Sequence, residues 1–95
     1  MPAENTETRR RRLRYQASYT GMKETDLLLG RFAAQYLDQL DDSQLDDFEA
    51  LLDAGDSQIY AWVMGNDTVP DAFDTYVYRL IKDFNSILFF KPIGI

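Results

Sequence analysis

The stretch TGMKETD, residues 20–26, separates two helical sequence patterns and decides how the chain folds. Gly21 interrupts the first pattern, and charged residues follow the glycine at once. A glycine between two helical runs typically supplies a backbone conformation with positive φ or allows another surface to come close. With Gly21 as the N-cap, Glu24 falls at the third helical position, where its carboxylate forms half of a capping box. We therefore expect a turn here, followed by a helix.

The helix that follows this turn, over residues 22–39, is expected to be the central element of the fold. Apolar side chains recur in it every three or four residues and form a broad stripe: Leu28, Leu29, Phe32, Ala33, Tyr36, Leu37 and Leu40. Gly30 lies inside this helix, where glycine costs about 1 kcal/mol relative to alanine. We therefore expect close contact with another helix at Gly30.

Four further helices are expected, over residues 9–18, 44–54, 57–64 and 71–86, because apolar residues recur there at helical spacing. The expected N-caps are Thr8 for the first and Ser43 for the third, and glycines end the third and fourth. The predicted fold class is all-α: a compact single-domain bundle of five helices. Aromatic residues at this spacing, Tyr60 and Trp62 included, are expected in the core rather than as a flavin-stacking surface.

The chain divides by composition into three parts. Residues 1–7 are polar and predict a flexible N-terminus, residues 8–87 carry the helical patterns, and residues 88–95 form a strongly apolar C-terminal tail. An exposed apolar tail promotes aggregation, so the tail is expected to pack on the body, self-associate or meet a partner.

Composition excludes several classes of chemistry. The 95 residues include no cysteine and no histidine, so thiolate chemistry, a Ser-His-Asp arrangement and histidine-ligated metal sites are ruled out. Catalysis by this chain alone is therefore not expected, and no catalytic or metal-binding residue is predicted. No apolar run is long enough to span a bilayer, and no membrane insertion is predicted.

Charge is divided unevenly along the chain. Residues 1–14 hold five arginines against two glutamates, a net +3, and the rest holds five basic against fourteen acidic side chains, a net −9. An acidic body disfavours nucleic-acid binding, which needs clustered basic residues. The arginines of residues 9–14 are either a solvated helix face or a docking patch for an acidic partner. Glu4 and Glu7 argue against a mitochondrial presequence, so a cytoplasmic location is predicted.

Three segments in order resemble the SdhE family, the FAD assembly factors or flavinylation chaperones of succinate dehydrogenase. They are RRRRLRY at residues 9–15, GMKETD at residues 21–26 and LLLGRFA at residues 27–33. The family signature is Arg-Gly-x-x-Glu, and Gly21 to Glu24 fill its last four positions. Thr20 stands where the family has arginine.

The resemblance implies a five-helix chaperone that binds the flavoprotein subunit of succinate dehydrogenase, and in relatives that of fumarate reductase. It implies that the chaperone promotes covalent attachment of FAD to a histidine of that subunit, with FAD held by the client and none held tightly here. A monomer is expected. The residues expected to contact the partner are Arg12, Arg14, Thr20, Gly21, Met22, Lys23, Glu24 and Asp26.

Two other functions remain open from the sequence. One is an antitoxin of a toxin-antitoxin pair, a label attached to members of the same family. The other is a small nucleic-acid-binding adaptor that uses the arginines of residues 9–14, for which binding to DNA would depend steeply on salt.

Overall fold

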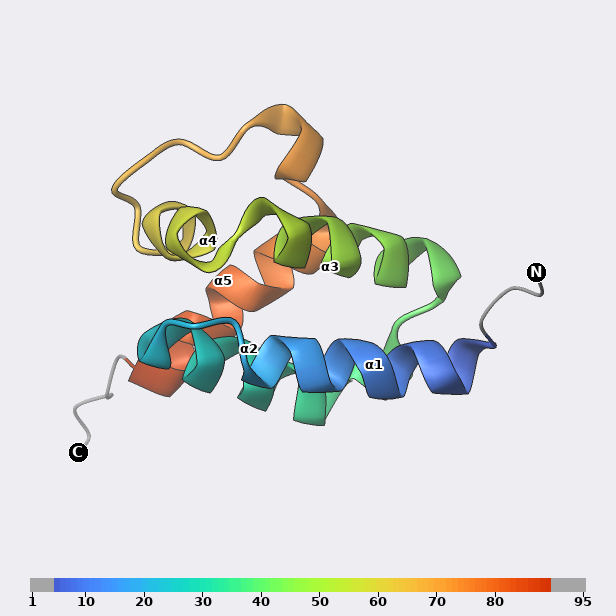
Figure 1. Cartoon of the computed structure of the whole chain (residues 1–95). Helices are drawn as coiled ribbons and strands as arrows, with labels where there is room; N and C mark the ends of the chain where they lie inside the picture. The colour runs from blue at the N-terminus through green and yellow to red at the C-terminus, as the bar shows by residue number, and fades with distance from the viewer. Residues whose placement is uncertain (1–4, 90–95) are drawn as a thin grey trace.

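The described part of the chain, residues 5–89 of the computed structural model, is built from helices. It forms five α-helices and two 3-10 turns (Figure 1): α1 (Thr6–Ser18), α2 (Lys23–Tyr36), η1 (Leu37–Gln39), α3 (Asp42–Ala54), α4 (Asp56–Val63), η2 (Asp71–Phe73) and α5 (Tyr76–Phe89). No strand occurs within these residues. The predicted all-α bundle of five helices is confirmed.

Helices α1 and α2 form a hairpin and lie side by side (Figure 1). Leu13 and Ala17 of α1 are fully buried in this contact region. At Gly30 of α2, an added Cβ would lie 3.1 Å from the hydroxyl oxygen of Ser18 and 3.6 Å from its Cα. The close helix contact expected at Gly30 is therefore confirmed.

The core is centred on three phenylalanines from different helices. The ring of Phe32 on α2 lies 5.8 Å from that of Phe48 on α3 and 5.9 Å from that of Phe84 on α5, the second pair edge to face. Burying a side chain of this size contributes about 1.5 to 3 kcal/mol. These contacts hold α3 and α5 against the central helix.

Helices α1 and α3 begin three and two residues earlier than predicted, and α4 begins one residue earlier, at Asp56. Helix α1 begins at Thr6, because the side chain of Asn5, rather than Thr8, accepts the capping hydrogen bond, 2.8 Å from the Thr8 nitrogen. Helix α3 is capped by Asp41 rather than Ser43. The side chains of Asp41 and Gln44 each accept from the other's backbone N–H, at 2.8 and 2.9 Å, which completes a capping box.

The last helix begins later than predicted. Residues 71–73 form the separate turn η2, and α5 starts at Tyr76. The hydroxyl of Thr75 accepts from the backbone nitrogen of Tyr78 at 3.1 Å, which is the bond that an N-cap makes. The backbone of residues 88 and 89, predicted as tail, continues α5. The remaining tail, residues 90–95, and residues 1–4 of the predicted flexible N-terminus lie outside the described residues.

Candidate functional site

The loop between α1 and α2 is held closed by Asp26. Both the backbone nitrogen and the hydroxyl of Thr20 donate to one carboxylate oxygen of Asp26, the hydroxyl at 2.6 Å. The bond from the Thr20 side chain lowers the pKa of Asp26, because it favours the charged carboxylate. Both residues are half-buried and bond each other, so they shape the loop from inside.

Gly21 takes the conformation that brings this loop against α4. Its φ is 118°, and an added Cβ would lie 3.0 Å from a carboxylate oxygen of Asp56, the first residue of α4. The positive φ leaves Gly21 outside the helix, and Met22, with φ −98°, is the N-cap. The prediction that Gly21 caps α2 is therefore wrong by one residue. Glu24 lies at the second helical position instead of the third.

Met22 ties the loop to α4, whereas its charged neighbours face solvent. The Met22 sulfur lies 3.9 Å from the hydroxyls of both Thr25 and Ser57. Lys23 and Glu24 are exposed, as is Gly21. Three of the residues expected to contact a partner thus form one exposed edge, which we call the loop edge: Gly21, Lys23 and Glu24.

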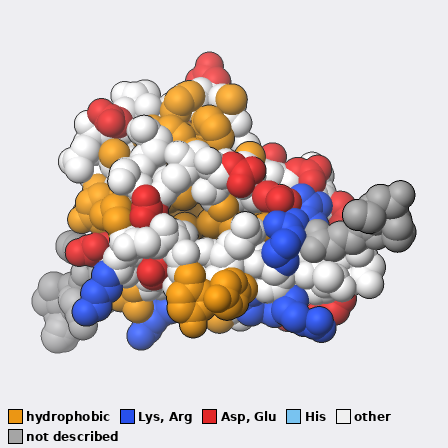
Figure 2. Space-filling model, viewed as in Figure 1, with side chains coloured by type: hydrophobic (Ala, Val, Ile, Leu, Met, Phe, Trp, Pro, Cys, Tyr) orange, Lys and Arg blue, Asp and Glu red, His pale blue; other side chains and the backbone are white. Residues whose placement is uncertain are grey.

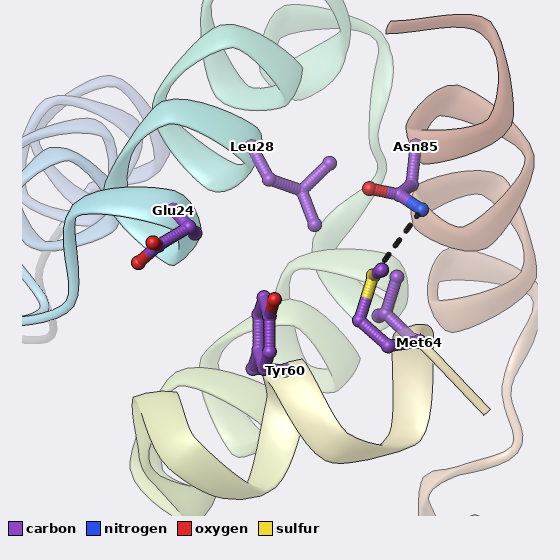
Figure 3. Close-up of a pocket in the computed structure, with 6 residues that line it drawn as sticks. Glu24, Leu28, Tyr60, Met64 and Asn85 are labelled. Atoms are coloured by element: carbon purple, nitrogen blue, oxygen red, sulfur yellow. Dashed lines mark hydrogen bonds between the residues drawn. The ribbon is translucent and has the colours of Figure 1, made fainter. Parts of the chain in front are cut away.

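A pocket opens beside the loop edge, between α2, α4 and α5 (Figure 3). It has a volume of about 160 Å³ and its lining is almost wholly apolar. The lining residues are Glu24, Leu28, Tyr60, Val63, Met64 and Asn85. In Figure 3 the Glu24 carboxylate points away from Leu28 and Met64, so this acidic group lies at the edge of the pocket. We call this hollow the apolar pocket.

A second hollow of about 300 Å³ lies on the other side of the loop, between α1 and the junction of α3 and α4. Tyr15 and Tyr19 stack at its wall with ring centroids 4.7 Å apart, and they are 67% and 69% exposed. Figure 2 shows hydrophobic side chains gathered over the end of α1. Sequence analysis missed this aromatic pair. The sequence contains a signal for it, because Tyr15 and Tyr19 are not on the buried helix face formed by Leu13 and Ala17, which predicts that their rings lie outside the core.

Four of the five arginines of α1, all except the exposed Arg11, contact α3, η1 or the Leu40 carbonyl of this chain. Arg9 contacts Asp46 at 2.7 Å and Glu49 at 2.9 Å. Arg10 donates to the backbone carbonyls of Leu37 at 3.2 Å and Leu40 at 2.8 Å. Neither the solvated face nor the docking patch considered from the sequence describes these contacts, which fasten α1 to its neighbours.

The two arginines expected to contact a partner also have partners within the chain. Arg12 lies 3.1 Å from Glu49, and Arg14 lies 2.8 Å from Asp38. The hydrogen bond from Arg12, with a smaller one from Arg9, lowers the pKa of Glu49. Arg12 and Arg14 lie on α1 rather than on the loop edge. Their role in partner binding stays a prediction.

The structure also bears on cofactor and metal chemistry. Trp62 is 5% exposed and packs on Phe73 with ring centroids 5.0 Å apart, so its ring is part of the core. Tyr60 is half-buried and lines the apolar pocket. Within residues 5–89, no group of three or more acidic side chains is placed to hold a metal ion. None of the helices in that range has the length and apolar character needed to cross a membrane.

Comparison with known proteins gives one consistent result. Residues 11–85 match a family described as flavinator of succinate dehydrogenase. The chain is 50% identical over 83 residues to mitochondrial succinate dehydrogenase assembly factor 2 of Meyerozyma guilliermondii, covering 83% of this chain and 62% of that protein. It is 41% identical over 73 residues to the protein of the same name from Dictyostelium discoideum, covering 77% and 52%. Its identity to assembly factor 2-B of Drosophila ananassae is 39% over 84 residues, covering 86% and 52%.

The chain therefore spans between about half and three fifths of the length of these relatives. The matched range includes α2, α3 and α4 in full and the loop edge.

Proposed function

The chain belongs to the family of flavinators of succinate dehydrogenase, and we propose that it binds the flavoprotein subunit of that enzyme and promotes covalent attachment of FAD. The family match confirms the resemblance found in residues 9–33. The flavoprotein subunit that the chain binds is called the client below.

The observation that carries the proposal is the loop edge. Gly21 is exposed, has a positive φ that favours glycine and carries no side chain of its own, so a partner backbone can come close to it beside the Asp56 carboxylate. Glu24 extends from the same edge and makes no capping bond that would occupy its carboxylate. An exposed edge of this kind suits a contact with another protein.

The mechanism that we propose is orientation of the client rather than catalysis by this chain. The chain has no histidine or cysteine, so the group that links to FAD belongs to the client. Holding the client's domains in the arrangement that brings FAD against that group raises the rate, because the reacting groups no longer have to find each other. We propose one chain per client and no tightly held FAD in the chain itself.

The proposal is tested with purified chain and client that holds FAD without the covalent bond. We expect a complex and faster covalent flavin incorporation, measured as flavin fluorescence of the denatured client. Absence of both complex and rate increase for the wild-type chain would refute the proposed function.

A pair of matched variants tests the loop edge within the same assay. Glu24→Gln is expected to slow incorporation while leaving the melting temperature within a few degrees. Glu7→Gln makes the same chemical change at an exposed position in the first turn of α1, just as Glu24 lies in the first turn of α2. Because Glu7 is not part of the loop edge, this control is expected to behave as wild type. Equal incorporation rates for the two variants would remove Glu24 from the contact.

The other two functions lack support from the site. The α1 arginines bind carboxylates and carbonyls of this chain, which reduces their availability for phosphates. None of the three relatives is named as an antitoxin.

The compartment remains a proposal. We propose that the chain acts where the client acquires FAD. The relatives are named as mitochondrial proteins, while the cytoplasmic location predicted from Glu4 and Glu7 stays a prediction. Fractionation of cells that express the tagged protein tests it.

A further inference from the structure

The apolar pocket adjoins the loop edge, because Glu24 belongs to both. We propose that the pocket receives one apolar side chain from a segment of the client, and that a lysine or arginine beside it in that segment pairs with Glu24. This inference rests on the proposed function and names the chemistry by which the client is recognised.

The size and lining of the pocket select a single apolar side chain. Its volume of about 160 Å³ is close to that of an engineered cavity of roughly 150 Å³ that binds benzene. Leu28 and Val63 are 3% and 5% exposed and belong to the core, so the wall that they form is backed by packed atoms. Met64 is 48% exposed. Its flexible thioether adapts to the shape of an incoming group.

The charge at the edge selects the neighbour of that side chain. Glu24 is exposed and has no basic partner within residues 5–89. Its carboxylate points away from the apolar wall (Figure 3), so the charge stays outside the hollow. Lys23 does not compete for it, because successive residues of a helix do not face each other. A cation in the client segment therefore finds a carboxylate beside the apolar wall.

FAD and a second copy of this chain fit the apolar pocket less well, and the chain's own residues 90–95 are left to experiment. The diphosphate of FAD is anionic and is repelled by Glu24, and a second copy of this chain carries the same net charge of −6. Residues 90–95 contain apolar side chains and follow α5, on which Asn85 lines the pocket. These alternatives are separated by experiment.

The test fills the pocket from its rim. Asn85→Phe adds a large apolar side chain at a half-buried lining position. Ser86→Phe adds the same side chain at the next position, which is exposed and does not line the pocket. Binding of each variant to FAD-loaded client is measured by titration calorimetry, with melting temperatures as the check on folding. We expect Asn85→Phe to bind about ten- to a hundredfold more weakly, as loss of one buried side chain predicts, and Ser86→Phe to bind as wild type.

A salt series tests the charged neighbour. Binding of the wild-type chain is expected to weaken as salt rises, and Glu24→Gln is expected to show a shallower dependence. Equal slopes for the two proteins would overturn the pairing with Glu24.

Each remaining outcome has one meaning. If wild type binds the client and folded Asn85→Phe binds equally well, the pocket proposal is wrong and the proposed function stands. If wild type does not bind the client, the proposed function itself falls. Binding of free FAD that Asn85→Phe abolishes would assign the pocket to flavin, and self-association that Asn85→Phe abolishes would assign it to a second copy. Tighter client binding after removal of residues 90–95 would assign it to this chain's own C-terminal segment; each of these three results overturns the proposal.

Discussion

Replacing Gly21 with alanine tests the geometry on which the loop edge depends. A non-glycine residue held at a φ of 118° is strained by about 1 to 3 kcal/mol. The added methyl would also lie 3.0 Å from the Asp56 carboxylate oxygen, so that side chain must shift. We expect Gly21→Ala to lower the free energy of unfolding by about 1 to 3 kcal/mol, which corresponds to a fall of about 5 to 20 °C in the melting temperature of a domain this small.

The assay is thermal and urea unfolding followed by far-ultraviolet circular dichroism, with Gly55→Ala as the matched control. Gly55 has a φ of 102°, but an added Cβ there would have no other atom within 4 Å. Gly55→Ala therefore reports the backbone strain alone, and the difference between the two variants reports the contact with Asp56. When Asp56 is also replaced by alanine, Gly21→Ala and Gly55→Ala are expected to lower the melting temperature equally. A melting temperature for Gly21→Ala within about 2 °C of wild type would refute the positive φ at Gly21.

Two further predictions concern charge. The pKa of Glu49 is lowered in the folded state by Arg12 and then by Arg9, so its contribution to stability is present above the ordinary pKa of 4.5 and is lost as pH falls through the lower folded value. The urea midpoint of Glu49→Gln is therefore expected to fall less than that of wild type between about pH 5 and pH 3, and an equally steep fall would contradict this. Thr20→Arg removes the hydroxyl bond to Asp26 and is expected to cost about 0.5 to 1.5 kcal/mol of stability in urea unfolding; an unchanged midpoint would show that the bond contributes nothing.

The sequence was sufficient to predict the core, because burial follows helical periodicity. Phe32 and Leu29, placed on the central stripe, are fully buried, and Gly30 makes the predicted helix contact. Glycine also identified the end of α3, where Gly55 has positive φ. These features depend on residues close in the chain, which is the information that a periodic pattern contains.

Helix starts were harder to predict, because several capping residues compete within a few positions. Asn5, Thr6 and Thr8 are all acceptable N-caps by type. The hydroxyl of Thr6 donates to Asp42 at 3.2 Å, across 36 residues, and this contact is compatible with a helix that already includes Thr6. At the last helix, Pro70 is tolerated in a first turn, but Thr75 supplies the capping oxygen. Local preference could not decide either case.

The role of the arginines could not be predicted for the same reason. Arg9 and Arg14 pair with acidic residues 37 and 24 positions away, and a sequence pattern does not show which carboxylates the fold brings to α1. From the sequence alone, the arginines of residues 9–14 are therefore interpreted as a surface that is either solvated or bound to a partner. Here they join α1 to α3 and η1.

The family motif points to the loop between α1 and α2, and the backbone at Gly21 separates the structural roles of its residues. Because Met22 is the N-cap, Asp26 rather than Glu24 reaches back across the loop, where it accepts from the backbone nitrogen of Thr20. Asp26 thus closes the loop, and α2 has no side-chain capping bond at its N-cap. What remains for Glu24 within the chain is its favourable position near the positive end of α2, worth about 0.3 to 1 kcal/mol at an exposed site. If Glu24→Gln slows flavin incorporation by a factor that corresponds to a larger free energy than this stability cost, the effect would have to arise at the contact with the client.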